Sequence, residues 1–139
     1  MAIESLFSGM RISSSGYTAQ RKLMDIIANN IANANSTRSA EGGPYKRMDA
    51  VLAPKVDSET GSEEGVEISK VFTDPSAPRL VYDPGHPDAN GDGYVQFPNV
   101  SIIREMANMI QVSRAYEANI TAMSAAKEMI SKSFEIANV

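Results

Sequence analysis

The sequence predicts a mainly α fold with a small β part, in which two long terminal helices flank a turn-rich middle segment. All seven prolines and seven of the nine glycines lie between residues 42 and 98, so helix breakers are almost confined to the middle. Both flanks repeat apolar residues every seven positions. Net charge changes at the same borders, with +2, −6 and 0 in the three segments of a chain of net charge −4. We therefore expect an amino-terminal helix within 1–40, a β and turn segment over 41–98 and a carboxyl-terminal helix within 99–139.

The first flank has a heptad stripe that is interrupted in its first half. Glycine costs about 1 kcal/mol relative to alanine inside a helix, and Gly9 and Gly16 bracket a serine-rich stretch. This half is expected to fray or bend when nothing supports it. The stripe consists of Ile3, Met10, Tyr17, Met24 and Ile31, with Leu6, Ile27 and Ala34 in the companion row.

The second flank predicts a longer helix. It follows Pro98, has Asn99 or Ser101 available as an N-cap, and contains no further glycine or proline. Because its apolar period equals that of the first flank, we expect the two helices to pair as a coiled coil. Its two rows are Ile102, Met109, Tyr116, Met123, Ile130 and Ala137, and Met106, Ile120 and Phe134.

Pairing would leave further apolar residues outside the seam. A lone hairpin of two helices would expose them to water, at a loss of about 25 cal/mol per Å². We expect helices from other copies to cover them, and the alternative is that they pack against the chain's own middle segment. These residues are Ile12, Leu23 and Ile26 in the first flank, and Ile103, Ile110, Val112, Met129 and Ile136 in the second.

The middle segment predicts a small β-hairpin module. Strands are expected at residues 45–53 and 65–73, where Val66 and Ile68 alternate with polar residues, and a short third strand at 80–82. The polar stretch 57–64 between the first two strands is expected to be a loop.

Composition offers little for catalysis or for ligand binding. The chain has no cysteine and a single histidine, His86, and no pair of acidic residues has the spacing of an acid and a base. We therefore predict no enzymatic activity, no catalytic residues and no cofactor or metal.

The acidic net charge argues against nucleic acid as a partner. No apolar stretch approaches the roughly 20 residues that span a bilayer, and no cleaved secretory signal is evident, which favours a cytoplasmic protein or one exported by way of an uncleaved amino terminus.

One stretch resembles half of a calcium-binding loop. Residues 88–93 read Asp-Ala-Asn-Gly-Asp-Gly, but Asn99 stands where an EF-hand needs a bidentate carboxylate, and residues 84–87 cannot form an entering helix. An asparagine- and aspartate-rich turn is the favoured interpretation.

Asparagines cluster near the end of the first predicted helix, at Asn29, Asn30, Asn33 and Asn35. Asparagine disfavours helix interiors because its amide competes for backbone groups. Either the helix frays here into a loop over 36–43, or the amides bond to other helices and fix their register. The pattern does not separate the two.

These residues also carry a family resemblance. Residues 28–37, ANNIANANST, closely resemble the amino-terminal signature of bacterial flagellar rod and hook axial proteins. Residues 41–47, 81–87, 93–95 and 98–100 are similar to the proximal rod members, as are residues 105–106, 113–119 and 126–129. The resemblance extends over nearly the whole chain.

The resemblance implies a structural subunit that the flagellar type III apparatus exports unfolded. The subunit would join other copies of itself and other rod proteins in the periplasmic rod of the basal body, with the membrane ring and surrounding rings as further neighbours. A small cytoplasmic helical or calcium-responsive binding module is the alternative. The residues expected to pack or to set register in the assembly are Ile3, Met10, Tyr17, Met24, Ile27, Asn29, Asn30, Ile31, Asn33, Asn35, Met106, Met109, Tyr116, Asn119, Ile120, Met123, Ile130 and Phe134.

Overall fold

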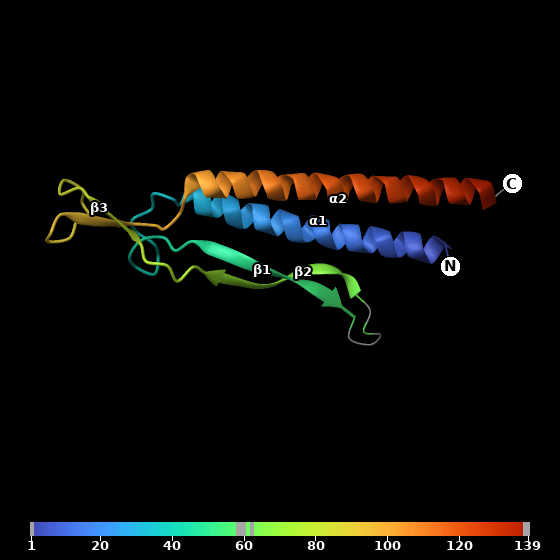
Figure 1. Cartoon of the computed structure of the whole chain (residues 1–139), viewed down its shortest axis with the longest axis horizontal. Coiled ribbons are helices and arrows are strands. Elements are labelled where there is room, and N and C mark those ends of the chain that lie inside the picture. The colour runs from blue at the N-terminus through green and yellow to red at the C-terminus, as the bar shows by residue number, and fades with distance from the viewer. Residues whose placement is uncertain (1, 58–60, 62, 138–139) are drawn as a thin grey trace. The chain divides into compact units, whose positions relative to one another are not determined.

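The computed structural model describes residues 2–57, 61 and 63–137. In that part of the chain, two long helices flank four strands in two small antiparallel sheets, which confirms the mainly α fold with a small β part (Figure 1). The helices are α1 (Ala2–Ala32) and α2 (Ile102–Ala137). The strands are β1 (Met48–Val56), β2 (Glu63–Thr73), β3 (Arg79–Tyr82) and β4 (Tyr94–Phe97).

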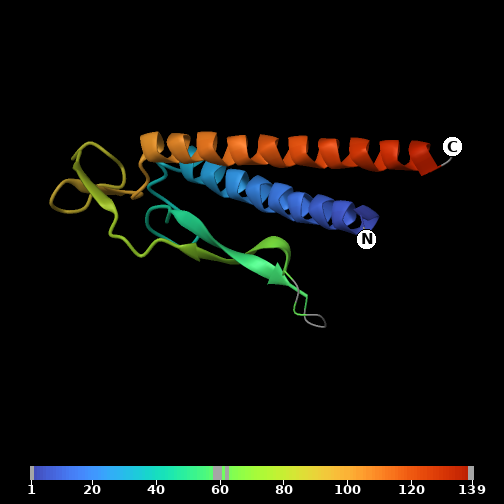
Figure 2. The same cartoon turned by 45° about the vertical axis from the view of Figure 1, so that its right-hand side comes forward.

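The two helices lie side by side and run in opposite directions (Figures 1 and 2). The first helix is continuous through Gly9 and Gly16, where α2 and β2 contact it. The fraying or bending expected when nothing supports this half stays a prediction for the unsupported helix. The second begins directly after Ser101, as predicted for an N-cap. The Ser101 carbonyl accepts the Glu105 N–H at 2.9 Å, and its hydroxyl lies 3.5 Å from the Arg104 nitrogen.

The first helix ends in the asparagine cluster. Its last turn tightens, because the Ala34 N–H bonds to the Ile31 carbonyl at 3.2 Å, three residues back. The Asn33 amide donates to the Asn29 carbonyl at 2.9 Å, and its oxygen accepts the Ser36 hydroxyl at 3.1 Å. Asn33 therefore satisfies backbone groups at the helix end.

The strands follow the prediction except for β4. The first two strands begin within three residues of the expected positions and pair as a hairpin, whose arrows point in opposite directions (Figure 2). The third pairs antiparallel with β4, in a register that places Val81 opposite Val95 and Tyr82 opposite Tyr94. The sequence does not predict a strand over Tyr94–Phe97, because four residues between turn residues and Pro98 are too few to establish a period of two.

The described chain groups into two compact units. The first comprises Met1–Met24, Val51–Lys70 and Gln111–Val139, and the second comprises Asp25–Ala50 and Val71–Ile110. The buried hydrophobic residues are few and mostly small: Ala19 and Ala126 in the first unit, and Ile27, Ala34 and Val95 in the second. Over the described residues, neither helix is hydrophobic enough along its length to cross a lipid bilayer.

Candidate functional site: the helix seam and its polar network

In the first unit the seam between α1 and α2 is built on a tyrosine pair and a glycine. The rings of Tyr17 and Tyr116 stack with centroids 4.7 Å apart and an interplanar angle of 29°. One residue earlier, Gly16 is buried, and a Cβ at this position would come within 2.9 Å of the Asn119 side-chain amide. Glycine here lets α1 approach α2 closely, so a residue that appeared to weaken the helix instead allows it to pack.

The same unit attaches β2 to α1 through Ser15. Its hydroxyl donates to the Ile12 carbonyl at 2.7 Å and accepts the Val66 N–H at 3.0 Å. Gly65 lies against the Ser15 side chain and has a φ of +127°, which favours glycine. There is no room for a side chain at this position, because a Cβ would fall 2.0 Å from the Ser15 hydroxyl oxygen. Gly65 therefore brings the β2 backbone to hydrogen-bonding distance of the helix.

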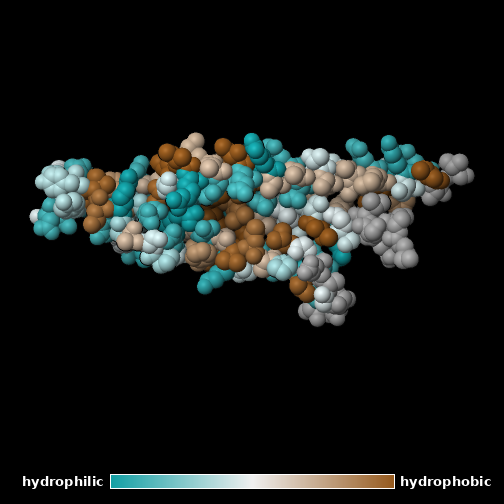
Figure 3. Space-filling view, viewed as in Figure 1, coloured by the Kyte–Doolittle hydropathy of each residue, from teal (hydrophilic) through white to brown (hydrophobic). Residues whose placement is uncertain are grey.

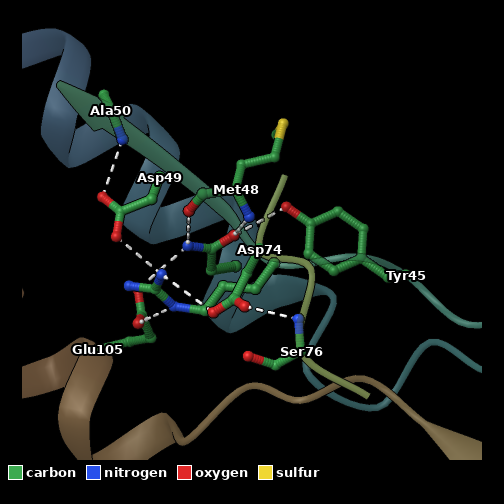
Figure 4. A network of polar contacts seen from close by, with 9 residues as sticks. Tyr45, Met48, Asp49, Ala50, Asp74, Ser76 and Glu105 are labelled. Carbon is green, nitrogen blue, oxygen red and sulfur yellow. Dashed lines mark hydrogen bonds and ion pairs between the residues drawn. The ribbon is translucent and has the colours of Figure 1, made fainter. Parts of the chain in front are cut away.

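In the second unit one buried asparagine, Asn30, joins three segments. Figure 4 shows its partners Tyr45, Met48 and Glu105 within the network. The Asn30 amide nitrogen donates to the Met48 carbonyl at 2.8 Å and to the Glu105 carboxylate at 3.1 Å. Its oxygen accepts the Met48 N–H and the Tyr45 hydroxyl, both at 2.9 Å. All four bonding positions of the amide are used, so Asn30 is fully buried without an unpaired group. It connects the end of α1 to the start of β1 and to the first turn of α2.

The charges of this network surround Arg47. Its Nε donates to the buried Glu105 carboxylate at 2.9 Å, and its Nη1 donates to Asp49 at 2.8 Å and lies 3.8 Å from Asp74. Burial opposes the charge of Arg47, but hydrogen bonds to Asp49 and Glu105 outweigh it and raise the arginine pKa. Burial, together with the Glu105 charge, also raises the pKa of Tyr45 and keeps its hydroxyl protonated as a donor.

The calcium-like stretch forms a clamp between two loops of the second unit. The Asp88 carboxylate accepts the Thr37 hydroxyl at 2.8 Å and also binds the Arg38 guanidinium. The Asn90 side chain accepts the N–H groups of Asp92 at 3.0 Å and Tyr94 at 2.9 Å, which is the expected asparagine turn. Among the described residues, no group of three or more acidic or histidine side chains could hold a metal ion.

His86 lies in the same loop. Its Nδ1 accepts the Asp88 N–H at 3.1 Å, and its ring centroid lies 6.1 Å from that of Phe97. His86 is therefore a turn histidine whose ring contacts the backbone.

Two family models match the two flanks. The flagella basal body rod protein family matches residues 10–38, and the flagellar basal body rod FlgEFG protein carboxyl-terminal family matches residues 92–136. The FlgC rod protein of Borreliella burgdorferi is 41% identical over 147 residues, covering 94% of this chain and 97% of the relative. The FlgC proteins of Bacillus subtilis and Salmonella typhimurium are 39% and 36% identical, over 94% and 98% of this chain and 97% and 98% of those relatives.

The chain belongs to the FlgC family of flagellar basal-body rod proteins. The helix seam lies in the segments that the two rod families match, as do Asn30 and Glu105 of the polar network. The other members of the network lie between the two matched segments. A FlgC-type chain is a rod subunit, so the surfaces that matter for its function are those that pack against neighbours.

The structure distributes the predicted packing residues of this FlgC-family chain over three environments. Ile27 and Asn30 are buried. The side chain of Ile3 lies outside those described. The half-buried residues are Met10, Tyr17, Met24, Ile31, Asn33, Met109, Tyr116, Asn119, Met123 and Ile130, and the exposed residues are Asn29, Asn35, Met106, Ile120 and Phe134.

Of the apolar residues expected outside the seam, most remain exposed within this chain, and Figure 3 shows hydrophobic side chains at the surface over α2. Ile103 and Ile136 are the extremes, at 83% and 77% exposed. Leu23, Ile26 and Val112 are half-buried, so the chain covers part of the surplus itself.

Sequence reasoning missed the partners of Asn30. Glu105 and Arg47 were quoted only within the family resemblance, and Tyr45 was assigned to a strand. The available signal was an acidic residue in the first turn of a helix, which is usually explained by the helix dipole.

Proposed function

We propose that the chain is a structural subunit of the proximal rod of the bacterial flagellum, without enzymatic activity. It polymerises with its own copies and other rod proteins into the periplasmic drive shaft. The observation that supports this is the exposed apolar surface of its paired helices, where Ile103 is 83%, Met106 55% and Ile110 56% exposed. Large exposed apolar surface on a folded chain marks a protein interface.

Export in the unfolded state through the flagellar type III apparatus fits this chain. It has no cysteine that could form a wrong disulfide in an oxidising space. Its long helices bury few large side chains, so they gain most of their stability after assembly. The membrane ring and the rings around the rod are the further neighbours we propose.

Within the assembly, we assign packing to the two heptad rows and register to the asparagine cluster. Asn29 and Asn35 have exposed side chains at the end of α1 and are available to neighbouring subunits. Asn30 acts inside the chain, through its bond to Glu105.

A charged residue in the seam tests the assignment. Ile31→Asp and Tyr116→Asp should prevent incorporation into rods and abolish motility, because each buries a carboxylate in an apolar contact. Lys127→Asp, at an exposed position of α2, is the matched control and should swim normally. Fractionated basal bodies and swimming halos give the two readouts. Normal motility of both seam variants, with stable expression, would refute the assignment.

A further inference from the structure

A groove of about 570 Å³ opens within the first unit. Its apolar lining comes from Met10 and Ala19 of α1, Val66 and Ile68 of β2, and Met123 of α2. Ala19 is buried and the other four are half-buried, so this apolar part of the lining is accessible from solvent, and polar and charged side chains complete the lining. A volume of this size accommodates two or three large side chains.

Charged side chains surround the groove, and some of them are ion-paired while others are not. Arg11 is held by Glu64 at 3.0 Å. Lys22 and Lys55 are exposed, and no ion pair reaches either of them within the described part of the chain. Glu67 is also exposed on the rim. An occupant with an apolar ridge, two carboxylates and one cation would complement this rim.

The carboxyl-terminal end of α2 has this composition. Met129 and Ile136 are 50% and 77% exposed, and their spacing of seven places them on one helix face. Glu128 and Glu135, also seven apart and exposed, follow one flank of that face, and Lys132 lies between the apolar ridge and the carboxylates.

The chain cannot fill its own groove with these residues. Met123 lines the groove from the same helix. Met129 and Ile136 lie about 9 and 20 Å further along its axis at about 1.5 Å per residue. The occupant must therefore come from another molecule.

We propose that this groove receives the carboxyl-terminal end of α2 from a second copy of the chain. Met129 and Ile136 insert between α1 and β2, while Glu135 faces Lys22 and Glu128 faces Lys55. The contact joins two different surfaces of one chain, so repeating it generates a ring or an open helical array rather than an isolated two-fold dimer. The proposal rests on the chain being a rod subunit and names which two of its surfaces meet.

Cysteine cross-linking tests the contact directly, because the chain has no cysteine of its own. Cells carrying Lys22→Cys together with Glu135→Cys as their only copy are treated with a short bifunctional thiol reagent, and basal bodies are isolated. Dimers and higher multiples are expected on a denaturing gel, several-fold above the yield from Lys22→Cys alone.

A matched control comes from the other side of α2. Lys127 is exposed, lies about 160° around the helix from Met129 by the shorter way, and is about 12 Å from Glu135 along the axis, so its side chain should not reach Lys22 in the proposed contact. Lys22→Cys with Lys127→Cys should give no more than the single variant. Equal cross-linking of both pairs, or no cross-linking in cells that still build rods, overturns the groove assignment and leaves the rod function intact. Absence of the unsubstituted chain from basal bodies would instead overturn the rod function.

A charge-reversal experiment tests the same contact if the double-cysteine chain does not assemble into rods. Lys22→Glu and Glu135→Lys should each lower rod incorporation on the order of tenfold, equivalent to about 1.4 kcal/mol. The two changes together should restore it, because the pair is rebuilt with opposite polarity. A double variant as defective as the singles contradicts the proposed contact.

Discussion

At Gly16, a hydrogen atom in place of a side chain sets how closely α1 approaches α2. A Cβ there would lie 2.9–3.1 Å from the amide atoms of Asn119, whereas Gly9 has nothing within 4 Å of its Cβ position. Gly16→Leu should lower the free energy of unfolding by about 1–3 kcal/mol through overpacking. Gly9→Ala should raise it by up to about 1 kcal/mol through helix propensity. Urea unfolding followed by circular dichroism measures both, and a Gly16→Leu chain as stable as the parent would show that the seam is not close-packed there.

Asp88 makes one part of the stability pH-dependent. The Thr37 hydroxyl and then the Arg38 guanidinium hold the pKa of its carboxyl below the ordinary value, against the opposing effect of burial. Because the folded pKa is the lower one, this stabilisation is complete above the unfolded pKa of about 3.9 and is lost as pH falls through the folded pKa.

Asp88→Asn should therefore lower the melting temperature at pH 7 and have progressively less effect below about pH 4. Asp92→Asn, in the exposed turn nearby, is the control. Thermal unfolding between pH 7 and pH 2 gives the comparison, and a penalty for Asp88→Asn that stays constant down to pH 2 would rule out the clamp as its source.

At the scale of elements, Glu105 is the point where α1, β1 and α2 meet. It is fully buried, accepts from Asn30 at 3.1 Å and pairs with Arg47 at 2.9 Å. Glu105→Ala should cost about 2–5 kcal/mol, because it leaves Arg47 partly buried without one of its two hydrogen-bonded carboxylates and removes the Asn30–Glu105 bond. Chemical denaturation gives the loss, and Glu128→Ala, at an exposed site of the same helix, should change stability by less than about 0.5 kcal/mol.

A double-mutant cycle distinguishes a network from separate contacts. Asn30→Ala combined with Glu105→Ala should cost less than the sum of the single losses, since both remove the same bond. Strict additivity would mean that Asn30 and Glu105 stabilise the chain independently.

Periodicity over long stretches explains which elements the sequence could predict. Both helices were predicted because the apolar period repeats in each flank. In the second flank, Gly and Pro are also absent and Ser101 is available as a cap. Strand β4 was not predictable from the sequence, and neither were the roles of Gly16 and Glu105. Gly16 packs against Asn119, and Glu105 bonds to Asn30. Both partners are distant in sequence, and no local pattern encodes such a pairing. The asparagine cluster was ambiguous for the same reason: Asn30 bonds across to α2, while Asn33 caps its own helix.

At the scale of the whole chain, the balance between buried and exposed apolar groups favours assembly. The buried hydrophobic residues include three alanines, while large side chains such as Phe7, Ile103 and Ile136 are 43%, 83% and 77% exposed. A folded chain gains about 25 cal/mol for each Å² of apolar surface it removes from water. Much of the stabilisation that apolar burial could give this chain is therefore gained only when neighbouring subunits cover its helices.

We therefore predict that assembly and folding respond to different substitutions within the second unit. Ile103, Met106 and Ile110 form an exposed stripe along the first turns of α2, whereas Ile27 is 7% exposed in the same unit. Replacing the three stripe residues by glutamine should leave the melting temperature of the isolated chain unchanged or slightly higher, because no buried contact is lost. The same variant should fail to enter rods and should abolish swimming.

Ile27→Gln should instead lower stability by several kcal/mol, since it buries an amide in place of an aliphatic group. Thermal unfolding of the purified chains, paired with swimming halos and immunoblots of isolated basal bodies, separates the two effects. If the triple variant swam normally, the stripe would not be a subunit interface. The proposal that neighbouring subunits cover the exposed apolar residues of the helices would then be wrong for the residues that carry it most clearly.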